Sequence, residues 1–139
     1  MRVAAQLELL APVEDAWRFA TDPHLLAAWW PGVAALVPDR RGLAAGGRWE
    51  LRRADRPSLL RRPAAEELLL VQAVEQHRLF RFHLTGQRLD CELRLDPAGP
   101  ARTHAQLVIS SAFLVGFQRS LAKVALRRLH SLCQTGAEI

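Results

Sequence analysis

The feature that most constrains this chain is a long series of alternating segments that ends in one amphipathic helix. Throughout residues 33–109, apolar and polar side chains alternate over short segments, which is typical of half-buried β-strands. The clearest segment is Arg88–Leu95, whose apolar face carries Leu89, Cys91, Leu93 and Leu95. A helix with an apolar stripe is predicted from about Ser111 to Gln134. Because a sheet must bury its apolar face, and no other predicted element is long enough to cover it, we expect this helix to lie across the sheet.

The N-terminal part of the chain predicts one strand and two short helices. Residues 3–9 alternate in the same way as the later strands. Pro12 stands where a helix begins, since proline is favoured in the first turn. Asp22 is expected to cap a second short helix that has Pro23 at its first position, and the pair Pro31–Gly32 ends that helix.

The remaining segments complete a sheet. Strands are predicted at 33–37, 48–53, 68–76, 79–84, 88–95 and 103–109. Ala54–Pro63 is expected to be a hairpin loop or an irregular sheet edge, and Pro97–Pro100 a turn. Within 79–84, the phenylalanines should face opposite to Arg81 and His83. This order predicts an α+β helix-grip fold: a curved antiparallel sheet of six to seven strands, two short helices after the first strand, and the long C-terminal helix across the concave face.

Length and composition are those of one ordinary globular domain spanning residues 1–139. Charges interrupt the apolar runs well before the ~20 residues that a membrane span needs, and the N-terminus alternates like a strand instead of forming a signal peptide. We therefore expect a cytoplasmic protein. Cys91 and Cys133 lie far apart and belong to no metal-binding spacing, so we expect two buried free thiols, no metal and no cofactor.

Two motifs resemble those of a known superfamily. APVEDAW after the first strand resembles aP-x-x-x-vW, and DPHLLAAWWPGV resembles Dp-x-x-l-a-x-w-PG. With GLAAGGRWEL, the strand series, Thr103 and the C-terminal helix, the whole chain resembles the SRPBCC superfamily of START domains, polyketide cyclases and dehydrases, and pollen allergens. DPHLLAAWWPGV is most similar to the group associated with carbon monoxide dehydrogenase and to generic cyclase/dehydrase domains. The resemblance implies a helix-grip fold with a deep apolar cavity that binds lipids, polyketides or other hydrophobic molecules.

The implied cavity gives the aromatic side chains a role, because rings from a short helix, the sheet and the long helix would either line it or fill it. The residues expected to contact a ligand are Trp29, Trp30, Trp49, Phe80, Phe82, Cys91, Phe113, Phe117, Leu121 and Arg128. A helical wheel places Arg128 on the apolar side, where a buried guanidinium needs a partner. That partner is an anionic ligand group or a structural carboxylate, unless the side chain reaches solvent past the sheet edge.

The formal charge of +5 comes almost entirely from arginine, with Lys123 as the one lysine. A cluster surrounds the central hairpin and consists of Arg48, Arg52, Arg53, Arg56, Arg61 and Arg62. It suits an anionic membrane surface or an acidic protein partner, and it equally suits a solvated edge strand whose charges block further strand pairing. We do not expect nucleic acid to bind, because no stacking aromatic residues are interleaved with these arginines.

Three functions fit these observations, and the first is preferred. It is a non-catalytic binding or carrier domain for a hydrophobic small molecule or lipid, neutral or anionic. The second is an enzyme similar to polyketide cyclases and dehydratases, which needs a general acid or base inside the cavity. The chain has no tyrosine, and the strand alternation places His83, Asp90 and Glu92 outside, so we lean away from catalysis. The third is an assembly or membrane-recruitment module that uses the arginine cluster.

Overall fold

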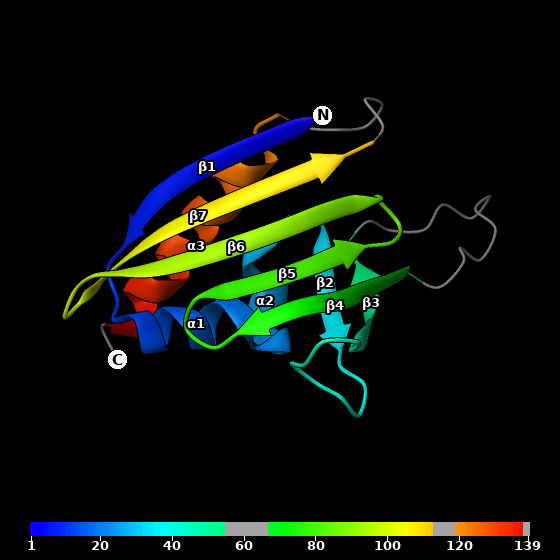
Figure 1. The fold of residues 1–139 in the computed structure, drawn as a ribbon, viewed down its shortest axis with the longest axis horizontal. Coiled ribbons are helices and arrows are strands. Elements are labelled where there is room, and N and C mark those ends of the chain that lie inside the picture. Colours follow the sequence, from blue (N-terminus) through cyan, green and yellow to red (C-terminus); the bar gives the residue numbers. More distant parts are fainter. Residues whose placement is uncertain (55–66, 113–118, 138–139) are drawn as a thin grey trace.

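In the computed structural model, which describes residues 1–54, 67–112 and 119–137, seven strands form one antiparallel sheet. Two short helices follow the first strand, and a longer helix ends the chain (Figure 1). The helices are α1 (Val13–Thr21), α2 (Pro23–Trp29) and α3 (Leu121–Ala137). The strands are β1 (Arg2–Leu9), β2 (Val33–Val37), β3 (Arg48–Arg53), β4 (Glu67–Glu75), β5 (Leu79–Leu84), β6 (Leu89–Gly99) and β7 (Arg102–Ser111). The predicted α+β helix-grip architecture is therefore confirmed.

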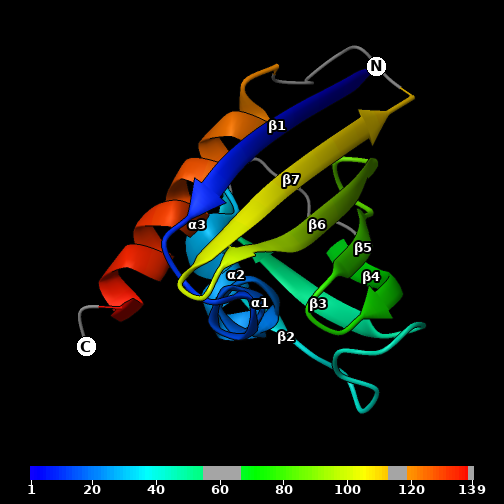
Figure 2. The same cartoon turned by 60° about the vertical axis from the view of Figure 1, so that its left-hand side comes forward.

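The strands lie in the order β1-β7-β6-β5-β4-β3-β2, so the first two strands of the chain form the two edges of the sheet. The sheet is curved, and all three helices lie on its concave side (Figure 2). α3 packs mainly against β1, and it also contacts α1, α2 and β7. α2 packs against β2 at the other edge. We call the side of the sheet that faces the helices its inner face, and the opposite side its outer face.

The predicted alternation decides which side chains lie on each face. On β6, Leu89, Cys91, Leu93 and Leu95 are all buried. Asp90 and Arg94 of the same strand are exposed, and Glu92 is half-buried. The phenylalanines of β5 are fully buried, whereas Arg81 is exposed. Because β5, β6 and β7 pair in one register, their buried residues form a continuous apolar surface beneath the helices.

The two short helices begin as the sequence predicts. The carboxylate of Asp22 accepts hydrogen bonds from the backbone N–H groups of His24 and Leu25, at 2.9 and 3.3 Å. These bonds satisfy donors that have no partner within α2, and Pro23 at the first helical position needs none. The indole N–H of Trp29 donates to the carbonyl oxygen of Ala20 at 3.3 Å, which joins the end of α2 to α1.

Two predicted boundaries were wrong. The last helix begins at Leu121 instead of Ser111, because Ser111 and its neighbour Ser110 pair with β6 and continue β7. β6 extends to Gly99 across an irregularity after Pro97, so that the predicted turn is shorter than expected. Both errors have one cause: pairing between β6 and β7 overrides the local signal. Apart from Ala54, the loop predicted at Ala54–Pro63 lies outside the described residues.

Candidate functional site

Five of the predicted aromatic residues form one buried cluster on the concave side of the sheet. The ring centroids of Trp30 and Phe82 lie 5.4 Å apart in an edge-to-face arrangement, and those of Phe80 and Phe82 lie 4.8 Å apart. Trp29 contacts Trp30 at 5.5 Å, and Trp49 contacts Phe80 at 6.1 Å. None of the five side chains is more than 1% exposed. The structure therefore brings together rings from α2, its C-terminal end, β3 and β5, as the sequence predicted.

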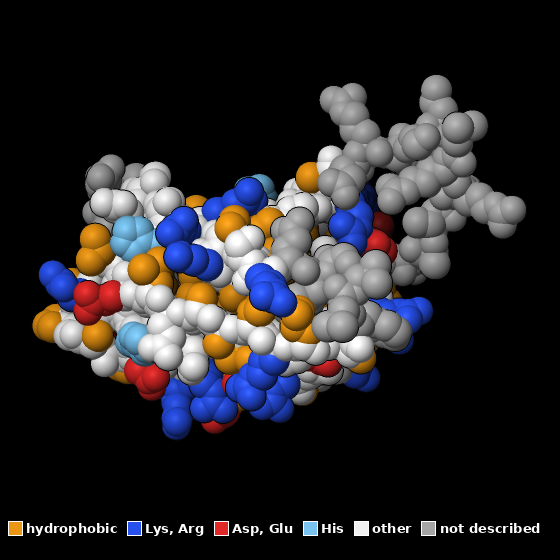
Figure 3. All heavy atoms as spheres, turned by 90° about the horizontal axis from the view of Figure 1, so that it is seen from above, with side chains coloured by type: hydrophobic (Ala, Val, Ile, Leu, Met, Phe, Trp, Pro, Cys, Tyr) orange, Lys and Arg blue, Asp and Glu red, His pale blue; other side chains and the backbone are white. Residues whose placement is uncertain are grey.

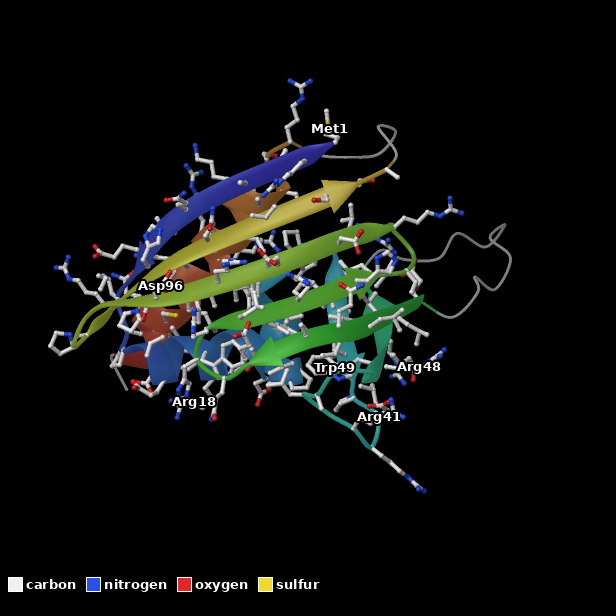
Figure 4. The ribbon with its side chains drawn as sticks, viewed as in Figure 1. Met1, Arg18, Arg41, Arg48, Trp49 and Asp96 are labelled. Carbon is white, nitrogen blue, oxygen red and sulfur yellow. The ribbon has the colours of Figure 1, made fainter. Side chains whose placement is uncertain are left out.

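Two of these tryptophans are held by hydrogen bonds to the backbone. Besides the bond from Trp29 to Ala20, the indole N–H of Trp49 donates to the carbonyl oxygen of Gly42 at 2.9 Å. Gly42 lies in the loop between β2 and β3. This loop also carries Arg41 and projects below the sheet in the view of Figure 4. Buried indoles usually find a partner in this way, because an N–H group without one costs free energy.

Trp30 differs from its two neighbours in the cluster. Its side chain is 1% exposed, and its Nε1 has no hydrogen-bond partner among residues 1–54, 67–112 and 119–137. The edge-to-face contacts with Trp29 and Phe82 fix the ring from two sides. The site therefore holds one oriented donor in an apolar environment. The aromatic composition of the motif indicated a buried site, but no sequence signal distinguished the N–H of Trp30 from that of Trp29.

The other predicted contact residues divide into three groups. Cys91 on β6 and Leu121 in the first turn of α3 belong to the same buried core, at 1% and 8% exposure. Phe113 and Phe117 lie outside the described residues, so the structure does not test their predicted role. Arg128 lies within the described residues and is exposed.

Of the three alternatives for Arg128, the structure agrees with a side chain that reaches solvent and disagrees with a buried guanidinium. The fully buried residues of α3 include Ala122, Ala125, Leu126 and Leu129, which places the buried stripe to one side of the predicted one. The helical wheel grouped apolar residues by position alone, whereas burial depends on which side of α3 packs against β1, β7, α1 and α2. An exposed guanidinium keeps its hydration, so Arg128 requires neither a ligand anion nor a buried carboxylate.

The outer face of the sheet carries the charged residues of β5 and β6, and they pair with each other. Arg81 donates to Glu92 at 2.6 Å, and Arg94 donates to the second oxygen of the same carboxylate at 2.9 Å. These two hydrogen bonds lower the pKa of Glu92 below its usual range. Figure 3 shows the molecule from above, so its lower margin is the outer face of the sheet, which is turned toward the viewer in Figure 1. Basic and acidic side chains gather along this margin.

His83 has a carboxylate partner that sequence analysis did not find. Its Nδ1 lies 2.9 Å from a carboxylate oxygen of Asp90, directly across the β5–β6 ladder. The two residues are seven positions apart, and only the hairpin register makes them neighbours. The predicted placement of His83, Asp90 and Glu92 on the outer face is confirmed, since none of the three belongs to the buried core.

An ion pair lies on the inner face where β3 ends and β4 begins. Arg53 Nε donates to both carboxylate oxygens of Glu67, at 3.0 and 2.8 Å, and both side chains are only about a quarter exposed. Alternation places Arg53 on the same face as Trp49, and Glu67 on the same face as Leu69. Within the predicted arginine cluster, Arg48 is exposed, Arg52 lies 3.5 Å from Glu50, and the three later arginines fall outside the described residues.

Two shallow hollows lie on the outer face and do not belong to the aromatic cluster. One, of about 210 Å³, is lined by Arg2, Arg81, Asp90, Cys91, Glu92, Val108 and Ser110. The other, of about 370 Å³, is lined by Val37, Pro38, Asp39, Arg48, Glu50 and Leu68. Both are open to solvent, and charged residues make up half or more of each lining, unlike the enclosed apolar site that the sequence predicted.

The chemistry available on the inner face is limited. Burial, with a smaller effect of Asp90, raises the pKa of Cys91 well above its usual range, so the thiol stays protonated. In the described parts of the chain, no group of three or more His, Cys, Asp and Glu side chains is placed to hold a metal ion. No helix in those parts is long and apolar enough to cross a membrane.

Comparison with known proteins identifies the family of this chain. The family described as "Polyketide cyclase / dehydrase and lipid transport" matches residues 1–137. The chain belongs to this family. The match covers nearly the whole chain, so the superfamily resemblance inferred from the two sequence motifs is confirmed. No curated protein matches the chain.

Solved structures with the same fold come from several sources. Protein MLL2253 of Mesorhizobium loti is 18% identical, with a TM-score of 0.72 over 97% of this chain and 98% of that one. Ara h 8.0201 is 7% identical, with a TM-score of 0.67 over 97% and 98% of the two chains. Aha1 from Colwellia psychrerythraea, solved as a dimer, is 12% identical, with a TM-score of 0.64 over 97% and 95%. At these identities the likeness shows that this polyketide cyclase/dehydrase family member shares their fold, and no more.

Proposed function

We propose that this chain is a binding or carrier domain for a hydrophobic small molecule or lipid, held between the inner face of the sheet and the helices. The observation that carries the proposal is the distribution of polar groups. The described inner-face positions of β5, β6 and β7 carry mostly aromatic and aliphatic side chains, with Cys91, Thr103 and Ser111 besides them and no charge, while the charged residues of β5 and β6 pair on the outer face. Sites for apolar ligands have this composition, with a small number of oriented polar groups. The family description, which includes lipid transport, supports the same reading.

The alternative of a polyketide cyclase or dehydratase requires a proton donor or acceptor beside the substrate. The titratable side chains on the described inner-face positions of β3 to β7 are Cys91, which burial keeps protonated, and Arg53 and Glu67, which pair with each other at one end of β3 and β4. Thr103 and Ser111 are the other polar residues there, and the hydroxyl of Thr103 is already bonded to the backbone. These observations favour binding over catalysis.

The third alternative, a recruitment module built on the arginine cluster, has less support. Of its described members, Arg52 lies beside Glu50 and Arg53 pairs with Glu67, so part of the positive charge is offset within the sheet. A surface that attracts an anionic membrane needs several uncompensated cations close together.

Binding is tested with a neutral, apolar fluorescent probe, N-phenyl-naphthylamine, and with native mass spectrometry of the same mixture. We expect one probe per chain, a rise in fluorescence and a higher Tm, since a ligand at 100 times its Kd stabilises the folded state by about 2.7 kcal/mol. The variant Phe82→Trp enlarges a side chain on the inner face and should weaken binding, whereas His83→Trp, on the outer face of the same strand, should not.

Absence of an adduct and of a Tm shift in the wild-type protein would contradict the proposal, whatever the variants do. Equal weakening by both variants would place the probe outside the inner face and would contradict it as well. If Phe82→Trp does not fold, the wild-type measurement and His83→Trp still decide the outcome.

A further inference from the structure

The indole N–H of Trp30, which has no hydrogen-bond partner among the described residues, indicates the chemistry of the ligand. This inference rests on the proposed function. More than nine in ten buried polar groups in proteins have a hydrogen-bond partner, and leaving one without a partner costs about 1–3 kcal/mol. Trp30 Nε1 is the one buried side-chain nitrogen or oxygen without a partner in the described part of the chain. Such a group calls for a physical explanation.

The adjacent tryptophan provides an internal comparison. Trp29 and Trp30 have the same side chain and similar burial, and they contact each other edge to face. The N–H of Trp29 is satisfied within the fold by the carbonyl oxygen of Ala20. The N–H of Trp30 has no acceptor within hydrogen-bonding distance among the described residues.

The ring of Trp30 is not free to turn toward another partner. Its backbone N–H bonds to the carbonyl oxygen of Leu26 at 3.0 Å, so the residue is fixed at the end of α2. Phe82 contacts the ring edge to face at 5.4 Å from the sheet side, and Trp29 contacts it at 5.5 Å. The donor is therefore oriented before any ligand arrives, which reduces the ordering cost of using it.

We propose that Trp30 Nε1 donates a hydrogen bond to a neutral acceptor oxygen, such as a ketone, ester or amide carbonyl, on an otherwise apolar ligand. The acceptor is uncharged because a single neutral N–H does not offset the desolvation of a buried carboxylate. The described inner-face positions of β5, β6 and β7 hold no cation, Arg53 on β3 is paired with Glu67, and Arg128 is exposed. The ligand class is thus a neutral carbonyl compound instead of an anionic molecule or a pure hydrocarbon.

The test uses two probes of nearly equal shape: acetylnaphthalene, which carries a ketone, and isopropenylnaphthalene, in which a methylene group replaces the carbonyl oxygen. Their dissociation constants are measured for the wild type, Trp30→Phe and Trp29→Phe. We expect the ratio of ketone to hydrocarbon affinity to fall about tenfold in Trp30→Phe, the size of one hydrogen bond. Trp29→Phe should leave the ratio unchanged, because its N–H bonds to the protein.

A second measurement uses the wild-type protein, labelled with ¹⁵N in its tryptophan indoles. The Nε1–H proton resonance of Trp30 should move downfield when the ketone binds and should not do so with the hydrocarbon. Single replacements of the other tryptophans, Trp17, Trp29 and Trp49, by phenylalanine assign the Trp30 resonance by elimination. This measurement therefore decides the question even if Trp30→Phe does not fold.

The outcomes separate this inference from the proposed function. Two results would overturn the inference while the binding function stands, provided that both probes bind. One is an affinity ratio in Trp30→Phe equal to that of the wild type, and the other is a Trp30 Nε1–H resonance that does not shift when the ketone binds. A buried water that satisfies Trp30 in place of a ligand gives that same result. If neither these probes nor the fluorescent naphthylamine binds, the proposed function itself fails.

Discussion

The hydroxyl of Thr103 donates a hydrogen bond of 2.8 Å to the carbonyl oxygen of Ala11, although 92 positions separate the two residues. Thr103 is fully buried at the start of β7, and Ala11, 3% exposed, lies in the connection between β1 and α1. The bond joins the sheet to the chain segment that leads into both short helices. It therefore helps to hold α1 and α2 over the inner face.

Replacing Thr103 with valine should lower the free energy of unfolding by about 1–3 kcal/mol, because the buried carbonyl of Ala11 loses its donor while the volume stays the same. Urea titration followed by circular dichroism measures the change. Thr135→Val is the matched control, since the hydroxyl of Thr135 bonds to Ser131 on an exposed part of α3, and it should change stability by less than about 0.5 kcal/mol. Equal effects of the two variants would contradict the assigned role of Thr103.

Glu92 should make stability depend on pH. Its pKa in the folded protein lies below the ordinary value of 4.5, because Arg81 and Arg94 donate hydrogen bonds to the charged form. A lowered pKa means that the carboxylate stabilises the fold fully above pH 4.5, and that this contribution is lost as the pH falls through the folded-state pKa.

Glu92→Gln should therefore destabilise the protein at pH 7 by no more than about 1 kcal/mol, because both arginine partners are half exposed to solvent. The difference from wild type should close below pH 4.5, as measured by urea titration across the pH range. Glu8→Gln, which breaks the more exposed pair with Arg102, should cost less at pH 7. A Glu92→Gln difference that grows in acid would show that the sign is wrong.

The two cysteines should be chemically inert in the folded protein. Burial, with a smaller effect of Asp15, raises the pKa of Cys133 to about 12. Burial likewise raises the pKa of Cys91. Because the thiolate is the reactive form, Ellman's reagent at about pH 8 should react slowly with native protein and fully after unfolding in guanidinium. The variants Cys91→Ser and Cys133→Ala assign the signals, and rapid reaction of either thiol in native protein would contradict its burial.

Two neighbouring residues on α3 should differ sharply in their effect on stability. Leu129 is fully buried, so Leu129→Ala should cost about 2–5 kcal/mol. Arg128 is exposed, so Arg128→Ala should change the free energy of unfolding by less than about 0.5 kcal/mol and should leave the affinity for the naphthylamine probe unchanged. A loss of more than about 1 kcal/mol in Arg128→Ala would contradict the exposure of this side chain.

Much of the site was predictable because its residues follow local rules. Alternation placed Phe80, Phe82 and Cys91 on the buried face of their strands, and it placed Asp90 and Glu92 on the opposite face. The cap at Asp22 could be recognised from its neighbours alone, since the residues it bonds are two and three positions away. Such features need no knowledge of the rest of the fold.

The start of α3 was not predictable from the same rules. An apolar stripe of helical period continued back to Ser111, yet that residue pairs with Leu89 in the sheet. Strand pairing satisfies its backbone groups across the fold, and this contribution outweighs a local periodicity. The buried side of α3 was not predictable either, because it depends on how the helix packs against β1 and the two short helices.

The sequence by itself determined the order of the elements, the faces of the strands and the apolar identity of the core, because periods of two and about 3.6 residues are properties of the local backbone. Only the tertiary structure decided which groups meet: His83 with Asp90, Arg53 with Glu67, and Thr103 with Ala11. It also decided that Trp29 finds an acceptor among the described residues and Trp30 does not. Hydrogen bonds act over about 3 Å and depend on direction, so they follow from register and packing, which no local pattern encodes.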